Sequence, residues 1–167
     1  MPAPGGFLPA PFFFVYNLKM FSAILLFAVG FLQGPAQKPI ETPHLTITTN
    51  ATPAAAGKVS LTVDVTPKPK MHVYSPGQAD YIVTTLTLEP NGAFTAAKTK
   101  YPDGEKYYME ALKETQLVYS KPFKITQDIT LKPGAKNVTV KGTLRYQACD
   151  DKICYLPKNV PVQWTLK

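Results

Sequence analysis

Hydrophobic and polar residues alternate along most of the chain after residue 40. The alternation is regular over residues 59–65, where every second position is Val or Leu, and residues 45–49 begin in the same way. Similar segments follow at residues 71–75, 81–88, 93–99, 116–126, 138–146 and 160–166. A period of two in segments rich in Val, Ile, Thr and Tyr predicts half-buried β-strands.

Turn-forming residues separate these segments. Pro-Gly, Asn-Gly or Asp-Gly pairs stand at residues 76–77, 91–92, 103–104 and 133–134, and such pairs favour tight turns. No long segment has a helical period, and residues 128–135 are predicted to be a loop. Seven or eight short strands in about 130 residues indicate an all-β protein, an antiparallel β-sandwich of the immunoglobulin type.

The first 36 residues have a different pattern. Residues 21–32 form an apolar run of 12 residues that follows Lys19 and precedes the small residues of Gly34-Pro-Ala36. This pattern predicts a signal peptide cut after Ala36, and Met20 is an alternative start. A membrane span needs roughly 20 apolar residues, and the apolar residues 11–15 leave an uncleaved anchor as the alternative. We therefore expect a single periplasmic or secreted domain over residues 37–167.

The basic charge of the chain does not indicate nucleic-acid binding. The net charge is +7, but the lysines are spread along the chain and Arg145 is the single arginine, whereas nucleic-acid-binding proteins cluster basic residues and favour arginine. His44 and His72 are the two histidines, and the spacing of the candidate ligands matches no known zinc site. We expect no cofactor and no metal, although copper(I) held by Cys and Met is an alternative.

The two cysteines, Cys149 and Cys154, are separated by four residues near the end of the chain. They lie between two predicted strands, in a turn expected to be exposed at one end of the sandwich. The pair is either a structural disulfide or a redox centre. A disulfide over so short a loop stabilises a fold by only about 2 kcal/mol, while close cysteines can resolve a mixed disulfide. Asp150 and Asp151 should raise the thiol pKa, which favours a reductant that reacts when a partner docks.

Two other segments are candidates for a role beside the cysteines. His72 and Tyr74 project from the same face of a predicted strand, and they are either a surface pair or neighbours of the sulfurs. Residues 105–115 contain two tyrosines, a methionine and a leucine between turn signals. This segment is either a loop or short helical turn that packs its own side chains, or a flap that covers a site.

The cysteine turn and its flanking strands resemble a known family. Residues 140–149 end in Tyr-Gln-Ala-Cys, and Cys154-Tyr-Leu-Pro157 and residues 160–164 follow. This pattern resembles the N-terminal periplasmic domain of the bacterial thiol:disulfide interchange protein DsbD. Residues 71–75 and 118–123 are also similar, so that the resemblance covers about residues 40–167. The separation of the cysteines is shorter than in some members, and Tyr155-Leu156 displaces the proline that follows the second cysteine.

The resemblance implies an immunoglobulin-like fold with a redox-active cysteine pair, in which Cys154 attacks the partner and Cys149 resolves the mixed disulfide. It implies that the site is lined by His72, Tyr74, Tyr146, Asp150 and Tyr155. It also implies a cap loop formed by Tyr107, Tyr108 and Leu112.

The implied function is electron transfer by a monomer, as in cytochrome c biogenesis. A separate membrane-embedded donor would supply the electrons, and periplasmic thioredoxin-like proteins would accept them. The alternative is a non-catalytic extracytoplasmic binding module of the same fold, in which the disulfide is structural.

Overall fold

The computed structural model describes residues 1–2 and 37–167. The predicted signal peptide therefore lies, apart from Met1 and Pro2, outside the described residues. Over the described part of the chain, no helix is long and apolar enough to span a membrane.

Residues 37–167 form strands joined by turns and loops. The strands are β1 (Ile40–Glu41), β2 (Leu45–Pro53), β3 (Lys58–Pro67), β4 (His72–Tyr74), β5 (Thr85–Leu88), β6 (Phe94–Ala96), β7 (Glu105–Met109), β8 (Glu114–Tyr119), β9 (Phe123–Leu131), β10 (Val138–Tyr146), β11 (Ala148–Cys149) and β12 (Lys158–Leu166). All their pairings are antiparallel, so that the predicted all-β class is confirmed.

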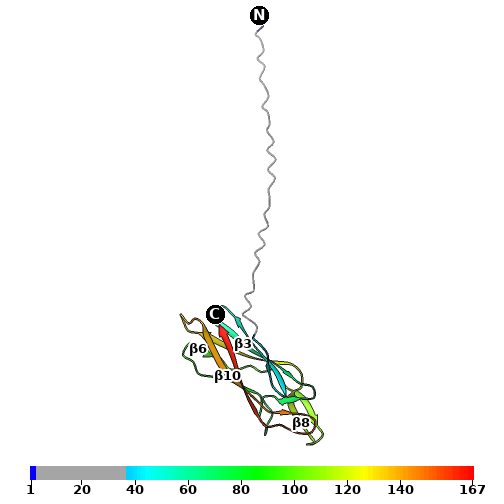
Figure 1. Ribbon diagram of the computed structural model, residues 1–167. Helices are drawn as coiled ribbons and strands as arrows, with labels where there is room; N and C mark the ends of the chain where they lie inside the picture. Colours follow the sequence, from blue (N-terminus) through cyan, green and yellow to red (C-terminus); the bar gives the residue numbers. More distant parts are fainter. Residues whose placement is uncertain (3–36) are drawn as a thin grey trace. The chain divides into compact units, whose positions relative to one another are not determined.

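Two of the sheets share the main hydrophobic core. One has the order β1-β2-β3-β9-β6 and the other the order β12-β10-β5. In β10 and β12 nearly every second side chain is buried, as the alternation in the sequence predicts. Trp164 of β12 is buried among these side chains and donates a hydrogen bond from Nε1 to the carbonyl oxygen of Thr62, 3.1 Å away in β3. The strands β3 and β10 run along the length of the domain (Figure 1).

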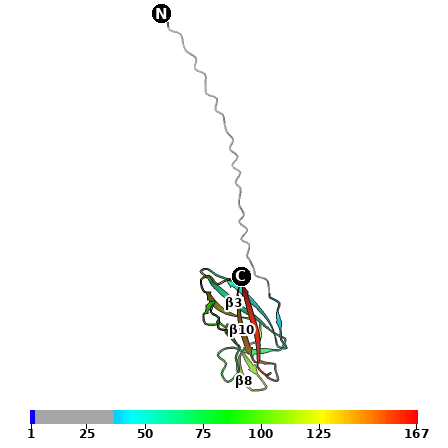
Figure 2. The same ribbon diagram turned by 60° about the vertical axis from the view of Figure 1, so that its left-hand side comes forward.

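A third, smaller sheet has the order β11-β4-β8-β7. Its strand β8 lies at the end of the domain that is opposite to the C-terminus, as both views show (Figures 1 and 2). This sheet adds Val73, Tyr119 and Ala148 to the main core, and it has a second, small core of Tyr74, Val118 and Cys149. The predicted cysteine turn therefore belongs to the small sheet, through the pairing of β11 with β4.

Residues 116–126 were predicted to be one strand, and this prediction was wrong. The segment divides into β8 and β9, which belong to different sheets. The break falls at Ser120–Lys121–Pro122, where Pro122 has no backbone N–H to donate to a strand partner. The chain thus leaves the small sheet and enters the large one within three residues.

Two predicted loops are also wrong in part. Residues 105–115, expected to be a loop or a helical turn, form most of the hairpin β7–β8, with Lys113 at a φ of 53° in its turn. Residues 128–131, expected to be the start of a loop, continue β9 beside β3. Conversely, residues 81–84 precede β5 without strand pairing. An alternating pattern bounded by turn residues therefore predicts that a strand exists, but not the residue at which its hydrogen-bonded pairing with a neighbouring strand ends.

Candidate active site

Cys149 and Cys154 form a disulfide that closes a tight turn. Their Cα atoms are 4.0 Å apart, and the backbone N–H of Tyr155 donates to the carbonyl oxygen of Ala148, 2.8 Å away. Cys149 is fully buried and Cys154 is half-buried, whereas Asp151, Lys152 and Ile153 between them are exposed. The turn is thus exposed as expected, but Cys149 is buried beneath it, and Cys154 is the more accessible cysteine.

Tyr74 of β4 contacts both sulfurs. Its hydroxyl oxygen lies 3.2 Å from Sγ of Cys149 and 3.3 Å from Sγ of Cys154. A disulfide has no S–H, so the Tyr74 hydroxyl is the group that can donate. Burial raises the pKa of Tyr74 to about 12, and the neighbouring Tyr81 and Glu114 add to this rise. Tyr74 therefore remains a neutral hydrogen-bond donor at physiological pH.

Tyr81 and Glu114 extend the contacts of Tyr74 away from the sulfurs. The Tyr81 ring stacks on the Tyr74 ring at 4.3 Å between centroids. The Tyr81 hydroxyl donates a hydrogen bond to Oε1 of Glu114, and Nε2 of Gln116 donates to the same oxygen at 2.6 Å. Neither Tyr81 nor Glu114 was predicted to belong to the site, and no motif in the sequence identifies them.

His72 is a second aromatic neighbour of Tyr74. It pairs with Cys149 in the strand register, meets Tyr74 edge-on at 6.4 Å and packs against Tyr107 at 4.7 Å between ring centroids. It is buried, which excludes the surface interpretation of His72 and Tyr74. Burial lowers the pKa of His72 more than the negative charges of Asp151 and Asp150 raise it. The imidazole is therefore neutral near pH 7.

The hairpin β7–β8 meets the cysteine turn through Tyr107. The Tyr107 hydroxyl donates a hydrogen bond to Oδ1 of Asp151 at 2.7 Å, and its ring packs against the small core that contains Cys149. Tyr108 and Leu112 of the same hairpin are exposed. Of the three residues expected in a cap, Tyr107 is thus the one that contacts the site, while the other two face solvent.

Asp150 organises the turn itself. Its Oδ1 accepts hydrogen bonds from the backbone N–H groups of Lys152 and Ile153, at 2.8 and 2.9 Å, and its Oδ2 accepts from the Tyr155 hydroxyl at 2.7 Å. These bonds, of which that from Ile153 lowers the pKa most, hold the pKa of Asp150 down to about 2. The carboxylate is therefore charged at neutral pH, and it holds the backbone that presents Cys154.

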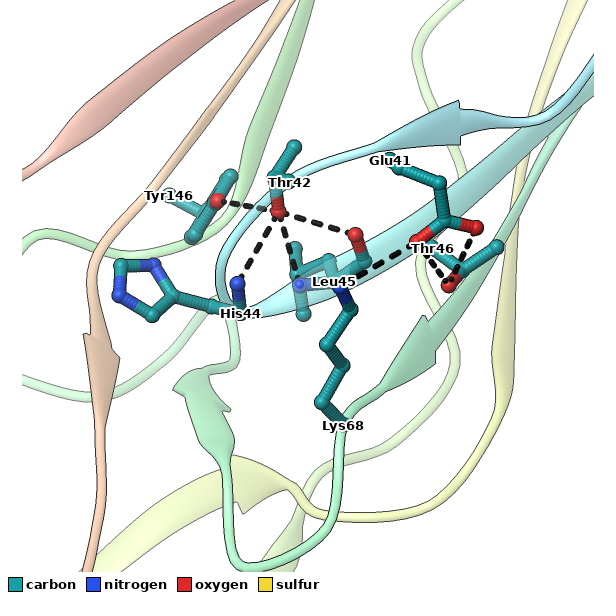
Figure 3. A network of polar contacts seen from close by, with 7 residues as sticks. All are labelled: Glu41, Thr42, His44, Leu45, Thr46, Lys68 and Tyr146. Atoms are coloured by element: carbon teal, nitrogen blue, oxygen red, sulfur yellow. Dashed lines mark hydrogen bonds and ion pairs between the residues drawn. The ribbon is translucent and has the colours of Figure 1, made fainter.

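Tyr146 lies in the main core rather than at the sulfurs. Its hydroxyl donates a hydrogen bond to Oγ1 of Thr42 at 3.0 Å. The same Oγ1 accepts hydrogen bonds from the backbone N–H groups of His44 and Leu45 (Figure 3). The His44 ring packs against Tyr155 at 4.6 Å between centroids. His44 thus reaches the cysteine turn through Tyr155, and the sequence does not reveal this link between residues 44 and 155.

The chain is similar to a known protein family and, in its fold, to a solved structure. The family model for the N-terminal domain of the thiol:disulfide interchange protein DsbD matches residues 40–163. No curated protein sequence matches the chain. The N-terminal periplasmic domain of ScsB from Proteus mirabilis has a similar structure, with a TM-score of 0.54 and 16% identity over 75% of this chain and 49% of that one. The chain therefore spans about half the length of that structure.

Two structures from Neisseria meningitidis are similar at lower scores. The reduced DsbD N-terminal domain has a TM-score of 0.45 and 16% identity, over 72% of this chain and 90% of that one. The complex of the DsbD and PilB N-terminal domains has a TM-score of 0.46 and 15% identity, over 70% of this chain and 80% of that one. The immunoglobulin-like fold is confirmed. Because the family model covers well over half of the sequence, the chain belongs to the family of the DsbD N-terminal domain.

Proposed function

We propose that the protein is an exported thiol–disulfide exchange domain that passes two electrons through the Cys149–Cys154 pair. The observation that supports this most directly is the disulfide itself, which has one buried and one partly accessible cysteine. Both sulfurs contact the same hydroxyl donor, Tyr74. A sulfur that must react with another protein has to be reachable, and Cys154 meets this condition better than Cys149.

The exchange proceeds in two steps. In the reduced domain, the Cys154 thiolate attacks one sulfur of a partner disulfide, which forms a mixed disulfide and releases the other partner sulfur as a thiolate that takes up a proton. Cys149 then loses its proton and attacks Sγ of Cys154, which closes the Cys149–Cys154 bond and releases the second partner sulfur. The domain loses two electrons and two protons, and the partner disulfide gains them.

The charges around the turn favour reaction within a docked complex. Asp150 is ionised at neutral pH, and a carboxylate beside a thiol raises the thiol pKa and reduces the thiolate fraction. A partner that covers the turn excludes water and places its disulfide against Cys154, which raises the local rate without a strongly acidic thiol. This supports a reductant that reacts with selected proteins.

Exposed apolar side chains support a protein partner. Within residues 37–167, large apolar side chains are exposed at Tyr108, Leu112, Ile153 and Leu156. All four belong to the two segments that meet at the site, the hairpin β7–β8 and the cysteine turn with its following residues. Exposed apolar side chains gathered in one region are typical of interaction surfaces. We assign the acceptor to the periplasmic thioredoxin-like proteins and the donor to a membrane-embedded protein, as the family membership suggests.

Single-cysteine variants test the proposed function. Cys149→Ser should accumulate a mixed disulfide with an oxidised thioredoxin-like protein, because Cys154 can attack and the domain has no second cysteine to resolve the bond. Cys154→Ser should accumulate little, because the remaining cysteine is buried. Non-reducing electrophoresis and mass spectrometry identify the linked residues. Failure to trap any partner on Cys149→Ser, together with unaltered folding, would favour the binding module with a structural disulfide instead.

A further inference from the structure

Tyr81 and Glu114 have no part in the two exchange steps, yet they connect the sulfurs to the surface through Tyr74. The Tyr74 hydroxyl contacts both sulfurs, and the Tyr81 ring stacks on the Tyr74 ring. The Glu114 carboxylate then accepts a hydrogen bond from the Tyr81 hydroxyl. The residues come from β4, from the loop before β5 and from β8. The three elements are thus linked to one another through Tyr81, next to the hydroxyl that contacts the disulfide.

We infer that Tyr81 and Glu114 are positioning residues that keep the Tyr74 hydroxyl between the two sulfurs, so that it can donate a hydrogen bond to whichever sulfur becomes negatively charged during exchange. This inference rests on the proposed function, and it adds residues that the two steps do not use.

The distances support a shared donor. The Tyr74 hydroxyl is 3.2 Å from one sulfur and 3.3 Å from the other, so a small rotation of its O–H bond directs the proton to either of them. In the first step, negative charge leaves Cys154, and in the second step it leaves Cys149. A single hydroxyl at nearly equal distances can therefore stabilise the charge before each attack, since hydrogen bonds to charged groups are the stronger ones.

The ring of Tyr74 is held from two sides. The ring of His72 lies roughly perpendicular to that of Tyr74, with 6.4 Å between the centroids, and His72 is fixed in β4 and buried. Tyr81 provides the stacked face, but it lies outside the strands and is only half-buried. The hydrogen bond to Glu114 is what ties its hydroxyl to β8. Without that bond the Tyr81 ring is free to turn toward solvent, and Tyr74 loses the contact that fixes its tilt.

Protonation states agree with these roles. The hydrogen bond to Glu114 raises the pKa of Tyr81, and the hydrogen bonds from Gln116 and Tyr81 lower the pKa of Glu114. At neutral pH Tyr81 is therefore a neutral donor whose single proton is used by an ionised carboxylate. The Tyr81 hydroxyl therefore cannot also donate a hydrogen bond to a sulfur, and Tyr81 acts on the sulfurs through Tyr74. No proton leaves Tyr74 in either step.

A double-mutant cycle on the full chain tests the inference. The readout is the rate at which the reduced protein reacts with oxidised glutathione. Tyr74→Phe should slow the reaction by on the order of tenfold, because it removes a hydrogen bond to a charged sulfur. Tyr81→Phe should slow it by roughly threefold, since it removes part of that same bond. In the Tyr74→Phe background, Tyr81→Phe should have no further effect, because the group that it positions is gone.

Matched variants separate positioning from folding. Tyr119→Phe removes another tyrosine hydroxyl bond, to the carbonyl oxygen of Pro102 at 2.6 Å, and should leave the rate unchanged. Glu114→Ala should reproduce the loss of Tyr81→Phe, and the two together should lose no more than either one alone. This second cycle does not depend on the folding of Tyr74→Phe.

Two results would overturn the inference: equal losses from Tyr81→Phe with and without the Tyr74 hydroxyl, or an unchanged rate in Tyr74→Phe. Oxidised glutathione reacts with a reduced cysteine pair whether or not a protein partner exists. Failure of the cycle is therefore distinguishable from failure of the proposed function, which the trapping of a partner on Cys149→Ser decides.

Discussion

The side chains around the sulfurs are uncharged where they are buried and charged where they reach the surface. Tyr74 and His72 are buried and neutral, whereas Asp150 at the edge of the turn is ionised because three hydrogen-bond donors surround it. This division keeps the buried surroundings of Cys149 uncharged. It also places the ionised Asp150 on the segment that a partner would cover.

The two buried histidines predict a loss of stability in mild acid. Burial lowers the pKa of both His72 and His44 below 6.5 in the folded state, so the unfolded chain binds protons more readily. Stability should then be constant above pH 7 and fall as the pH drops below about 6.5, by at most about 1.4 kcal/mol per pH unit for each histidine. Urea unfolding at pH 7.5 and 5.5 measures this difference.

Carboxylates act in a lower range of pH and do not obscure this effect. The folded pKa values of Asp150 and Glu105 are both about 2, against ordinary values of 3.8 and 4.5. Their contribution is present above these ordinary values and is lost only as the pH falls toward 2. The double variant His44→Gln, His72→Gln should therefore lose less stability between pH 7.5 and 5.5 than the natural protein. An equal loss in both proteins would show that the histidines are not the cause.

At the scale of elements, the site is the place where β4, the hairpin β7–β8 and the cysteine turn come together. Gly104, just before β7, allows the close approach of the hairpin to the end of β4. A Cβ atom at this position would lie 2.1 Å from Oγ and 2.7 Å from Cβ of the buried Ser75, which follows Tyr74. The hairpin is thereby held close enough for Tyr107 to reach both His72 and Asp151.

The apolar surface on these elements gives a prediction for partner recognition. Ile153 and Leu156 flank Cys154 in the sequence and are both exposed, Leu156 to 83%. Ile153→Ser with Leu156→Ser should slow exchange with thioredoxin by roughly fivefold or more, because the partner must cover both positions to reach the sulfur. Stopped-flow tryptophan fluorescence of thioredoxin follows the reaction.

Oxidised glutathione provides the control for this variant, because so small a disulfide reaches Cys154 without covering the surrounding surface. The reduced variant should react with oxidised glutathione at the same rate as the unsubstituted protein. A similar loss with thioredoxin and with glutathione would mean that the substitutions disturbed the sulfurs rather than the docking surface.

At the scale of the whole molecule, the alternation of residues predicted the faces of the main sandwich well. β10 and β12 bury the side chains that the sequence marks as apolar, because one face of each strand packs in the core. The small sheet was harder to predict, since residues 105–119 alternate only weakly and Pro122 moves the chain between sheets. His44 and Tyr81 join the site through folding alone, which no local pattern records.

The disulfide lies apart from the main core. The large cluster of buried side chains contains neither cysteine, whereas Cys149 belongs to the small cluster with Tyr74 and Val118. A loop of this length gains only about 2 kcal/mol from the bond. The sandwich should therefore stay folded when the pair is reduced, as an exchange domain requires.

The reduction potential of the Cys149–Cys154 pair tests the central claim most directly. The protein is equilibrated with glutathione or dithiothreitol buffers, and the fraction of free thiol is measured at each ratio. A pair that exchanges electrons with thioredoxin-like proteins should have a potential of roughly −270 to −180 mV. A value well below about −300 mV is typical of structural disulfides and would contradict the assignment of this pair as a redox centre.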